Sequence, residues 1–205
     1  MGCEHPWLAA ALDLLMRPLY PARRLVVPEA RGDVLELGVG TGLNFALYDA
    51  RAVTRLVGVE PDPHMLRRAR ARVPSPGVPT TLVRASAESL PLAGERFDTV
   101  VVTWALCTIP DPAAALREAR RVLRPGGRLV FVEHTRSTQP ALARVQHALT
   151  PLWKRLGGGC HLDRHTIELV RGSGLALTDV EPVGRERWTL LPVYRGAATR
   201  VASTA

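Results

Sequence analysis

Short apolar runs alternate with segments of helical periodicity between residues 33 and 133. The apolar runs fall at 34–37, 56–60, 80–84, 97–103 and 128–133. Their length and continuous hydrophobicity are typical of strands that are buried on both faces of a sheet. Helices are expected between them, one opening at Pro61 and one over 113–123 with Asp111 as its cap. This alternation predicts an α/β fold with a doubly wound, mostly parallel sheet.

The two ends of the chain extend this pattern. Apolar residues recur at helical spacing over residues 5–27, although Pro18 and Pro21 should break or kink that helix. After the fifth strand, we expect helices at 141–156 and 163–172, the second capped by Asp163, and strands at 175–183 and 188–194. A length of 205 residues suits one domain, with residues 1–30 as a capping region and residues 31–205 as the core.

Three alternate glycines follow the first predicted strand. Gly38, Gly40 and Gly42 permit a sharp turn and leave room for a ligand to approach the backbone. Thr41 and Asn44 stand where a new helix would begin, with free N–H groups that suit a nucleotide-like ligand. The spacing is not that of a dinucleotide-binding loop, because Leu43 occupies the position of its third glycine.

A carboxylate at the end of the second strand supports a nucleotide site. Glu60 lies about 20 residues past the glycines, the separation at which α/β folds place an acid on a ribose. Met65 follows on the next helix, where its soft side chain can lie against an adenine ring.

The pattern Glu36-x-Gly38-x-Gly40-x-Gly42 resembles motif I of the class I S-adenosylmethionine (SAM) methyltransferases. The resemblance implies a single Rossmann-like domain, helices on both faces, an antiparallel last strand, SAM as cofactor and S-adenosylhomocysteine as product. It places a polar-Ala-Glu segment against adenine, and the carboxyl end of the fourth strand should line the pocket. The expected cofactor-binding residues are Glu36, Gly38, Gly40, Thr41, Gly42, Asn44, Glu60, Pro61, Met65, Ser86, Ala87, Glu88, Thr103, Trp104 and Leu106.

Three further segments make the resemblance specific to one group of these methyltransferases. Leu106-Cys107, Glu133-His134 and the stretch 159–164 together resemble the thiol S-methyltransferases of the methyltransferase-like-seven group and their bacterial relatives. This implies methyl transfer to a small-molecule acceptor, with a small apolar thiol preferred. A phospholipid-amine N-methyltransferase, a quinol C- or O-methyltransferase and a non-catalytic SAM-binding scaffold stay open as alternatives.

Thiol methylation suggests roles for two histidines. The acceptor attacks as a thiolate, whereas an ordinary thiol has a pKa of about 8.5. A neutral histidine could take the proton, or a nearby cation could lower the thiol pKa. His134, at the end of the fifth strand, and His161, before a helix, are the catalytic candidates. The structural alternatives are a backbone hydrogen bond for His134 and a packing role for His161.

Charge and cysteine content exclude other classes of function. The net charge of +8 comes from scattered arginines and one lysine, Lys154, so no nucleic-acid partner is expected. Cys3, Cys107 and Cys160 form no C-x-x-C pair, and the spacing of cysteines and histidines fits no zinc pattern. We therefore expect no metal, no disulfide framework and a reducing, cytoplasmic location.

The N-terminal apolar segment is too short to span a bilayer. It runs from Trp7 to Met16, and Asp13 interrupts it. A helix there suits packing on the domain, a lid over the active site that includes Tyr20, or peripheral contact with a membrane surface. The oligomeric state does not follow from the sequence.

Overall fold

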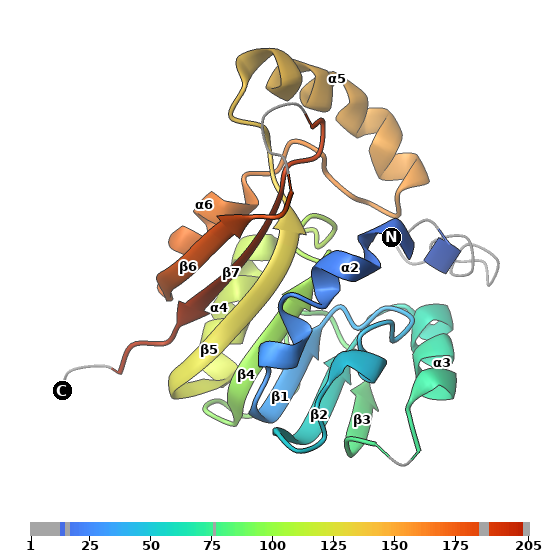
Figure 1. Cartoon of the computed structure of the whole chain (residues 1–205), viewed down its shortest axis with the longest axis vertical. Helices are drawn as coiled ribbons and strands as arrows, with labels where there is room; N and C mark the ends of the chain where they lie inside the picture. The colour runs from blue at the N-terminus through green and yellow to red at the C-terminus, as the bar shows by residue number, and fades with distance from the viewer. Residues whose placement is uncertain (1–12, 15–16, 76, 185–188, 203–205) are drawn as a thin grey trace.

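The chain folds around one seven-stranded sheet (Figure 1). The structure is a computed structural model that describes residues 13–14, 17–75, 77–184 and 189–202. Spatial order in the sheet is β3-β2-β1-β4-β5-β7-β6. The strands are β1 Gly32–Leu37, β2 Val53–Val59, β3 Thr80–Val83, β4 Phe97–Thr103, β5 Leu123–His134, β6 Ala176–Pro182 and β7 Val193–Thr199.

Strand direction confirms the predicted sheet. β1 pairs in parallel with β2 and β4, β2 with β3, and β4 with β5. β7 runs antiparallel to both β5 and β6. The strand order reverses between β1 and β4, so their carboxyl ends form the crevice where doubly wound sheets bind ligands.

Helices cover both faces of the sheet, and each face has its own apolar cluster. Leu35 and its same-face neighbours pack with α4 (Pro112–Val122) and α6 (Thr166–Arg171). Val34, on the opposite face, packs with α3 (Pro63–Arg72) and the segment around η2 (Val27–Glu29). α5 (Pro140–Leu156) lies beyond the carboxyl ends of the strands (Figure 1). Among the described residues, no helix combines the length and hydrophobicity needed to cross a bilayer.

The N-terminal segment is less regular than predicted. Its described part contains the 3-10 turn η1 (Arg17–Leu19) and the one-turn helix α2 (Tyr20–Arg23), not a helix that continues to residue 27. Pro18 and Pro21 lie in these short pieces, as their breaking effect predicts. Residues 13–14 are helical, as predicted, whereas residues 5–12 and 15–16 of the predicted helix lie outside the described residues.

The predicted helix after the glycines is wrong. The connection contains only the 3-10 turn η3 (Phe45–Leu47), and β2 begins at Val53. Tyr48 ends the turn in an extended conformation, which lets its hydroxyl reach Glu36 at 2.8 Å. A buried side-chain contact therefore determines the backbone at this point.

Two boundaries near the C-terminus also differ from prediction. α6 begins at Thr166 without a side-chain cap, because Asp163 instead binds His147 Nδ1 at 2.8 Å. β7 covers 193–199, not 188–194, and the predicted start lies outside the described residues. Gly196 is required where the strand crosses Phe131, since a Cβ would lie 2.5 Å from that ring. Gly196, Ala197 and Ala198 give little hydrophobic signal, so the sequence pattern placed this strand too early in the chain.

Candidate active site

The glycine corner follows β1 with three backbone positions in the left-handed region. Gly38, Gly40 and Gly42 have φ of +68°, +55° and +84°. A Cβ on Gly38 would lie 2.8 Å from the Cβ of Ala105, in the loop after β4. At Gly40 the nearest atom to such a Cβ is 4.0 Å away, which leaves the space through which a ligand can approach. The predicted tight turn is present.

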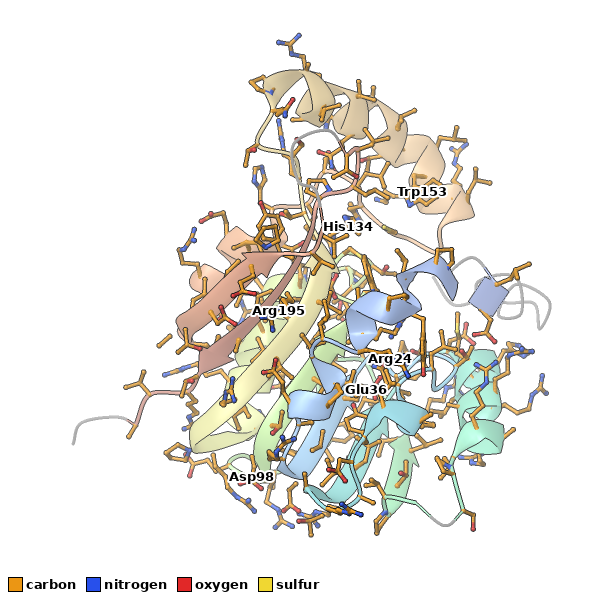
Figure 2. The ribbon with its side chains drawn as sticks, in the orientation of Figure 1. Arg24, Glu36, Asp98, His134, Trp153 and Arg195 are labelled. Atoms are coloured by element: carbon orange, nitrogen blue, oxygen red, sulfur yellow. The ribbon has the colours of Figure 1, made fainter. Side chains whose placement is uncertain are left out.

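Glu36 is the centre of a buried polar network beside the glycines (Figure 2). Its carboxylate accepts hydrogen bonds from Asn44 Nδ2 at 2.7 Å and from the Tyr48 hydroxyl at 2.8 Å. Arg23 of α2 donates to Asn44 Oδ1 at 3.0 Å and to Thr103 Oγ1 at 2.6 Å. Burial raises the pKa of Glu36 to about 7, although Tyr48, Arg23 and Asn44 oppose the shift. Arg23 thus places a buried positive charge between the ends of β1 and β4.

Glu60 connects the end of β2 to the glycine corner. Its carboxylate accepts from the amide of Gly40 and from the amide of Asp62, each at 3.0 Å. Burial raises the pKa of Glu60, and these two amides oppose the shift. Each carboxylate oxygen keeps a lone pair for a ribose hydroxyl. Asp62 caps α3 by accepting from the amide of Met65 at 3.0 Å, which fixes Met65 in the first turn of that helix.

Two residues outside the glycine corner, Arg72 and Asp13, hydrogen-bond to Thr41. Arg72 of α3 donates to the Thr41 carbonyl at 3.0 Å and to its hydroxyl oxygen at 2.7 Å. Asp13 accepts from the same hydroxyl and pairs with Arg72 at 2.6 Å. These contacts join the N-terminal segment to the loop that we expect to face the cofactor.

The segment after β3 is held by its own side chains. The Ser86 hydroxyl donates to Glu88, and the other Glu88 oxygen accepts from the amide of Asp111 at 3.0 Å. Ala87 is buried in the core next to these residues. The predicted adenine contact of Ser86, Ala87 and Glu88 stays a prediction.

The loop after β4 begins with a strained residue. Trp104 has φ of +57°, which is unusual for a bulky side chain, and its amide donates to the carbonyl of Val132 at 3.0 Å. Leu106 is fully buried. The ring centroid of Trp104 lies 6.5 Å from that of His134, at the end of β5. The strained backbone thus directs this loop across the ends of β4 and β5.

Glu133 fixes this loop from β5. Its buried carboxylate accepts from the amides of Ala105 at 2.6 Å, Leu106 at 2.9 Å and Cys107 at 3.3 Å. Burial raises the pKa of Glu133, while the amides oppose the shift. The carboxylate of Glu133 therefore hydrogen-bonds backbone amides and fixes the conformation of the loop after β4.

Cys107, His134 and Cys160 form a compact cluster where β5 ends. His134 Nε2 lies 3.0 Å from Cys160 Sγ, and the nitrogen and two sulfur atoms all lie within 4.8 Å of one another. The hydrogen bond between the thiols, together with burial, raises the pKa of Cys107 well above its ordinary value. The same thiol contact lowers the pKa of Cys160, although burial opposes the shift. Burial lowers the pKa of His134, but the adjacent Cys107 and Glu133 outweigh it and raise the pKa above the ordinary value.

Arg164 holds the loops of this cluster together. Its guanidinium donates to the carbonyls of Leu106 at 2.5 Å and Ile109 at 2.6 Å. The amide of His161 donates to the carbonyl of Cys107 at 2.9 Å. The His161 ring contacts Arg164 at 3.2 Å, and burial, followed by the charge of Arg164, lowers its pKa. His161 therefore lies in the same loop system as His134 but outside the compact cluster.

An apolar groove lies between α5 and the segment before β7. Its volume is about 300 Å³, and its lining residues are Leu149, Leu152, Trp153, Leu156, Leu162, Leu190 and Leu191. The Trp153 side chain also lies close enough to the Cys160 thiol to lower its pKa, after the larger effect of Cys107, so the groove wall reaches the cluster. Figure 2 shows Trp153 on α5 and His134 near the tip of β5. The arrangement provides an apolar surface that leads to sulfur and imidazole groups.

Comparison with known proteins identifies the family. Residues 35–131 match the family model described as a methyltransferase domain. The chain is 37% identical over 186 residues to human thiol S-methyltransferase TMT1B, an alignment that covers 81% of this chain and 75% of the human protein. The chain belongs to the SAM-dependent methyltransferases. This methyltransferase is also 38% identical over 128 residues to phosphatidylethanolamine N-methyltransferase of Cereibacter sphaeroides, covering 62% of each chain.

Solved structures confirm the fold of this methyltransferase. A chain from the complex of the Haloferax volcanii Trm112 methyltransferase activator with a methyltransferase matches with a TM-score of 0.71 at 19% identity, covering 96% of each chain. The alignment with rat TMT1B, at 37% identity, covers 65% of this chain and 55% of the rat protein. The family and fold imply SAM as the methyl donor.

The carboxyl ends of the strands fit a ligand of this kind. Two buried donors there, Arg23 Nε and Trp104 Nε1, have no hydrogen-bond partner among the described residues, and the same holds for His134 Nδ1 at the end of β5. The two donors come from α2 and from the loop that begins where β4 ends. Buried donors normally have partners, so a polar molecule at this edge would satisfy them.

Two residues of this edge were missed by the sequence reasoning. Arg23 is one of many arginines, and nothing local marks it as buried. Glu133 precedes His134 in the sequence, but its hydrogen bonds to three backbone amides depend on the loop after the neighbouring strand. The contact of Cys107 with Cys160 and His134 joins three segments that are distant in sequence, so their spacing carried no signal.

Proposed function

We propose that this methyltransferase transfers the methyl group of SAM to the sulfur of a small apolar thiol. The observation that carries the proposal is the apolar groove whose wall, at Trp153, reaches Cys160 and so the imidazole of His134. Such a groove suits an alkyl or aryl group, and its polar end suits a reacting heteroatom. The similarity to TMT1B supports sulfur as that atom.

The cofactor residues predicted from the sequence take roles around the glycine corner. We propose that Gly38, Gly40 and Gly42 admit the methionine part of SAM and that Glu60 accepts from the ribose hydroxyls. Arg23, with its unpartnered Nε, would pair with the methionine carboxylate.

The remaining predicted positions surround these groups. Glu36, Asn44 and Thr103 hold Arg23 in place, and Thr41 shapes the loop. Pro61, Met65, Ser86, Ala87 and Glu88 would border the adenine. Trp104 and Leu106 would separate the cofactor from the acceptor, since they follow β4 towards His134.

His134 is the catalytic residue in this proposal, and His161 supports its loop. The acceptor sulfur forms a bond to the methyl carbon while the bond from that carbon to the sulfonium sulfur breaks, which leaves S-adenosylhomocysteine. Two routes to the thiolate fit a histidine at this point: the neutral ring takes the thiol proton, or a cation at the ring lowers the thiol pKa. Both routes need Nε2, so removing the ring tests the assignment whichever route operates.

The experiment follows a labelled methyl group from SAM into acceptors that differ in one atom. An alkyl thiol is compared with the alcohol and the amine of the same chain, and a phospholipid amine and a quinol are run beside them. We expect label in the thiol alone. Label in the phospholipid or quinol instead would contradict the thiol assignment and favour those acceptors. Cofactor binding without transfer to any of them would favour a SAM-binding scaffold.

A further inference from the structure

Cys107, His134 and Cys160 have the chemistry of a metal site. We propose that they bind a thiophilic divalent cation, with Zn²⁺ as the fitting ion, and leave one coordination position for the acceptor thiol. The proposal of a metal site depends only on the geometry of the three residues. The proposal that the acceptor thiol takes the fourth coordination position rests on the proposed function. The proposal departs from the expectation drawn from residue spacing, because the fold unites residues that the sequence separates.

The distances suit tetrahedral coordination. With Zn–S of about 2.3 Å and Zn–N of about 2.0–2.1 Å, tetrahedral ligand atoms lie roughly 3.5–3.8 Å apart. In the cluster, all three ligand atoms lie within 4.8 Å of one another, and His134 Nε2 is 3.0 Å from Cys160 Sγ. Small rotations of the two cysteine side chains are enough to reach the required spacing.

The surrounding protein positions the ligands before any ion binds. Glu133 holds the amide of Cys107 at 3.3 Å, and the carbonyl of Cys107 accepts from the amide next to Cys160 at 2.9 Å. The carbonyl of His134 accepts from the Thr166 hydroxyl at 2.9 Å. These contacts tie the three ligand segments to one another, as a preorganised metal site requires.

Charge balance also favours a divalent cation. Two thiolates and Zn²⁺ sum to zero, so before the acceptor binds the zinc-loaded site adds no net charge to a buried position. Arg164 and Glu133 flank the cluster with opposite charges. Soft thiolate ligands combined with imidazole select zinc over calcium or magnesium.

The number of ligands points to a reactive site, not a structural one. Within the described ranges, no fourth histidine, cysteine or carboxylate joins the group. Structural zinc sites have four protein ligands, whereas catalytic sites have three and an open position. Trp153 brings the apolar groove to Cys160, so an acceptor in the groove has its sulfur next to that position.

Coordination of the acceptor thiol at the open position would generate the nucleophile directly. A thiol that coordinates zinc loses its proton, which passes to solvent, and stays bound as a thiolate. Its sulfur then forms the new bond to the methyl carbon, and the electron pair of the broken bond stays on the sulfur of the product S-adenosylhomocysteine. The cation is neither oxidised nor reduced. This is the second of the two routes described above.

The test measures bound metal in tag-free protein purified under reducing conditions. Zinc is added and removed by gel filtration, and the amount retained per chain is determined by mass spectrometry. Wild type is compared with Cys107→Ser, Cys160→Ser and the control Cys3→Ser, which removes a cysteine that is not one of the three proposed ligands. Binding of S-adenosylhomocysteine verifies that each variant is folded. Cobalt replaces zinc in a parallel sample, because thiolate–cobalt absorption reports the ligands.

We expect one retained ion per chain in wild type and Cys3→Ser. In both cluster variants, metal affinity should fall more than tenfold, since even loss of an outer-shell partner costs about 10–100-fold. Addition of an alkyl thiol should change the cobalt spectrum of the wild type. Failure of folded wild type to retain zinc, equal retention by the cluster variants, or a Cys107–Cys160 disulfide in protein trapped directly from cells would overturn the site.

The two proposals can fail separately. Zinc retention without thiol methylation would contradict the proposed function and leave the metal site standing. Equal thiol methylation by zinc-free and zinc-loaded protein would overturn the role of the open position and leave the proposed function standing.

Discussion

The cofactor corner and the acceptor end of this methyltransferase lie at the same edge of the sheet but are built differently. The corner at β1 and β4 is a network of charged and amide groups around Arg23 and Glu36. The acceptor end at β5 combines two thiols and an imidazole with a groove of leucine and tryptophan side chains. One end suits a charged, hydrogen-bonding molecule, and the other suits an apolar molecule with a soft reacting atom.

The difference suggests that binding of donor and acceptor can be altered independently. No described hydrogen bond connects the Arg23–Glu36 network directly to the three-residue cluster; Trp104, in the loop after β4, lies between them. Effects of substitutions without shared partners usually add. Substitutions at the cofactor corner should therefore change cofactor binding and leave acceptor binding intact, and substitutions at the acceptor end should do the reverse.

The largest stability effect at the cofactor end should follow Arg23→Ala. It leaves Asn44 Oδ1 without its buried donor, Thr103 Oγ1 with Asn44 as its remaining donor, and Glu36 without a nearby positive charge. We expect the free energy of unfolding to fall by about 2–3 kcal/mol. Arg24→Ala is the matched control, because Arg24 is exposed and should change stability by less than about 0.5 kcal/mol. Denaturant unfolding of both variants measures the difference, and equal losses would contradict the buried role of Arg23.

Gly40→Ala should weaken cofactor binding beyond its effect on the backbone. Gly40 and Gly126 both have positive φ, +55° and +80°, and space around a new Cβ. Either alanine should cost about 1–2 kcal/mol of stability. Only Gly40 faces the proposed cofactor site, where an added methyl group should lower affinity for S-adenosylhomocysteine roughly 30-fold. Calorimetric binding checks this, and an equal loss in Gly126→Ala would count against the glycine corner.

Glu36 should make the stability of the ligand-free protein depend on pH. Its folded-state pKa of about 7 lies above the ordinary value of 4.5, so the folded state holds an extra proton between these values. The free energy of unfolding should therefore fall as pH rises from 4.5 to 7 and level off above that range. Glu36→Gln should remove this contribution. Unfolding of both proteins across the range measures it, and parallel curves would refute the assignment.

The smallest effect should follow a change in the groove wall. Leu152→Asn puts an amide into the groove, whereas Leu25→Asn changes an exposed leucine elsewhere. Apolar pocket contacts contribute about 1–3 kcal/mol, so KM for a small alkyl thiol should rise roughly 10-fold or more in Leu152→Asn. Affinity for S-adenosylhomocysteine should not change. An unchanged KM would show that the acceptor binds elsewhere.

The same contrast decides what the sequence could predict. Strand–helix alternation and the glycines lie within short windows, so their patterns predicted all five parallel strands and the turn at Gly38 to Gly42. The absent helix at Asn44 and the shifted β7 depend on distant partners, Glu36 and Phe131. The thiol–imidazole cluster joins residues 107, 134 and 160, and only the assembled sheet reveals it.

The central claim is that His134 acts on the acceptor and not on the cofactor. The most direct measurement compares His134→Ala with His147→Ala, an exposed histidine of α5, in both methyl transfer to an alkyl thiol and affinity for S-adenosylhomocysteine. We predict that His134→Ala loses about 100-fold or more in transfer rate with unchanged affinity, while His147→Ala keeps both. Full transfer activity in His134→Ala, or a parallel loss of cofactor affinity, would contradict the account.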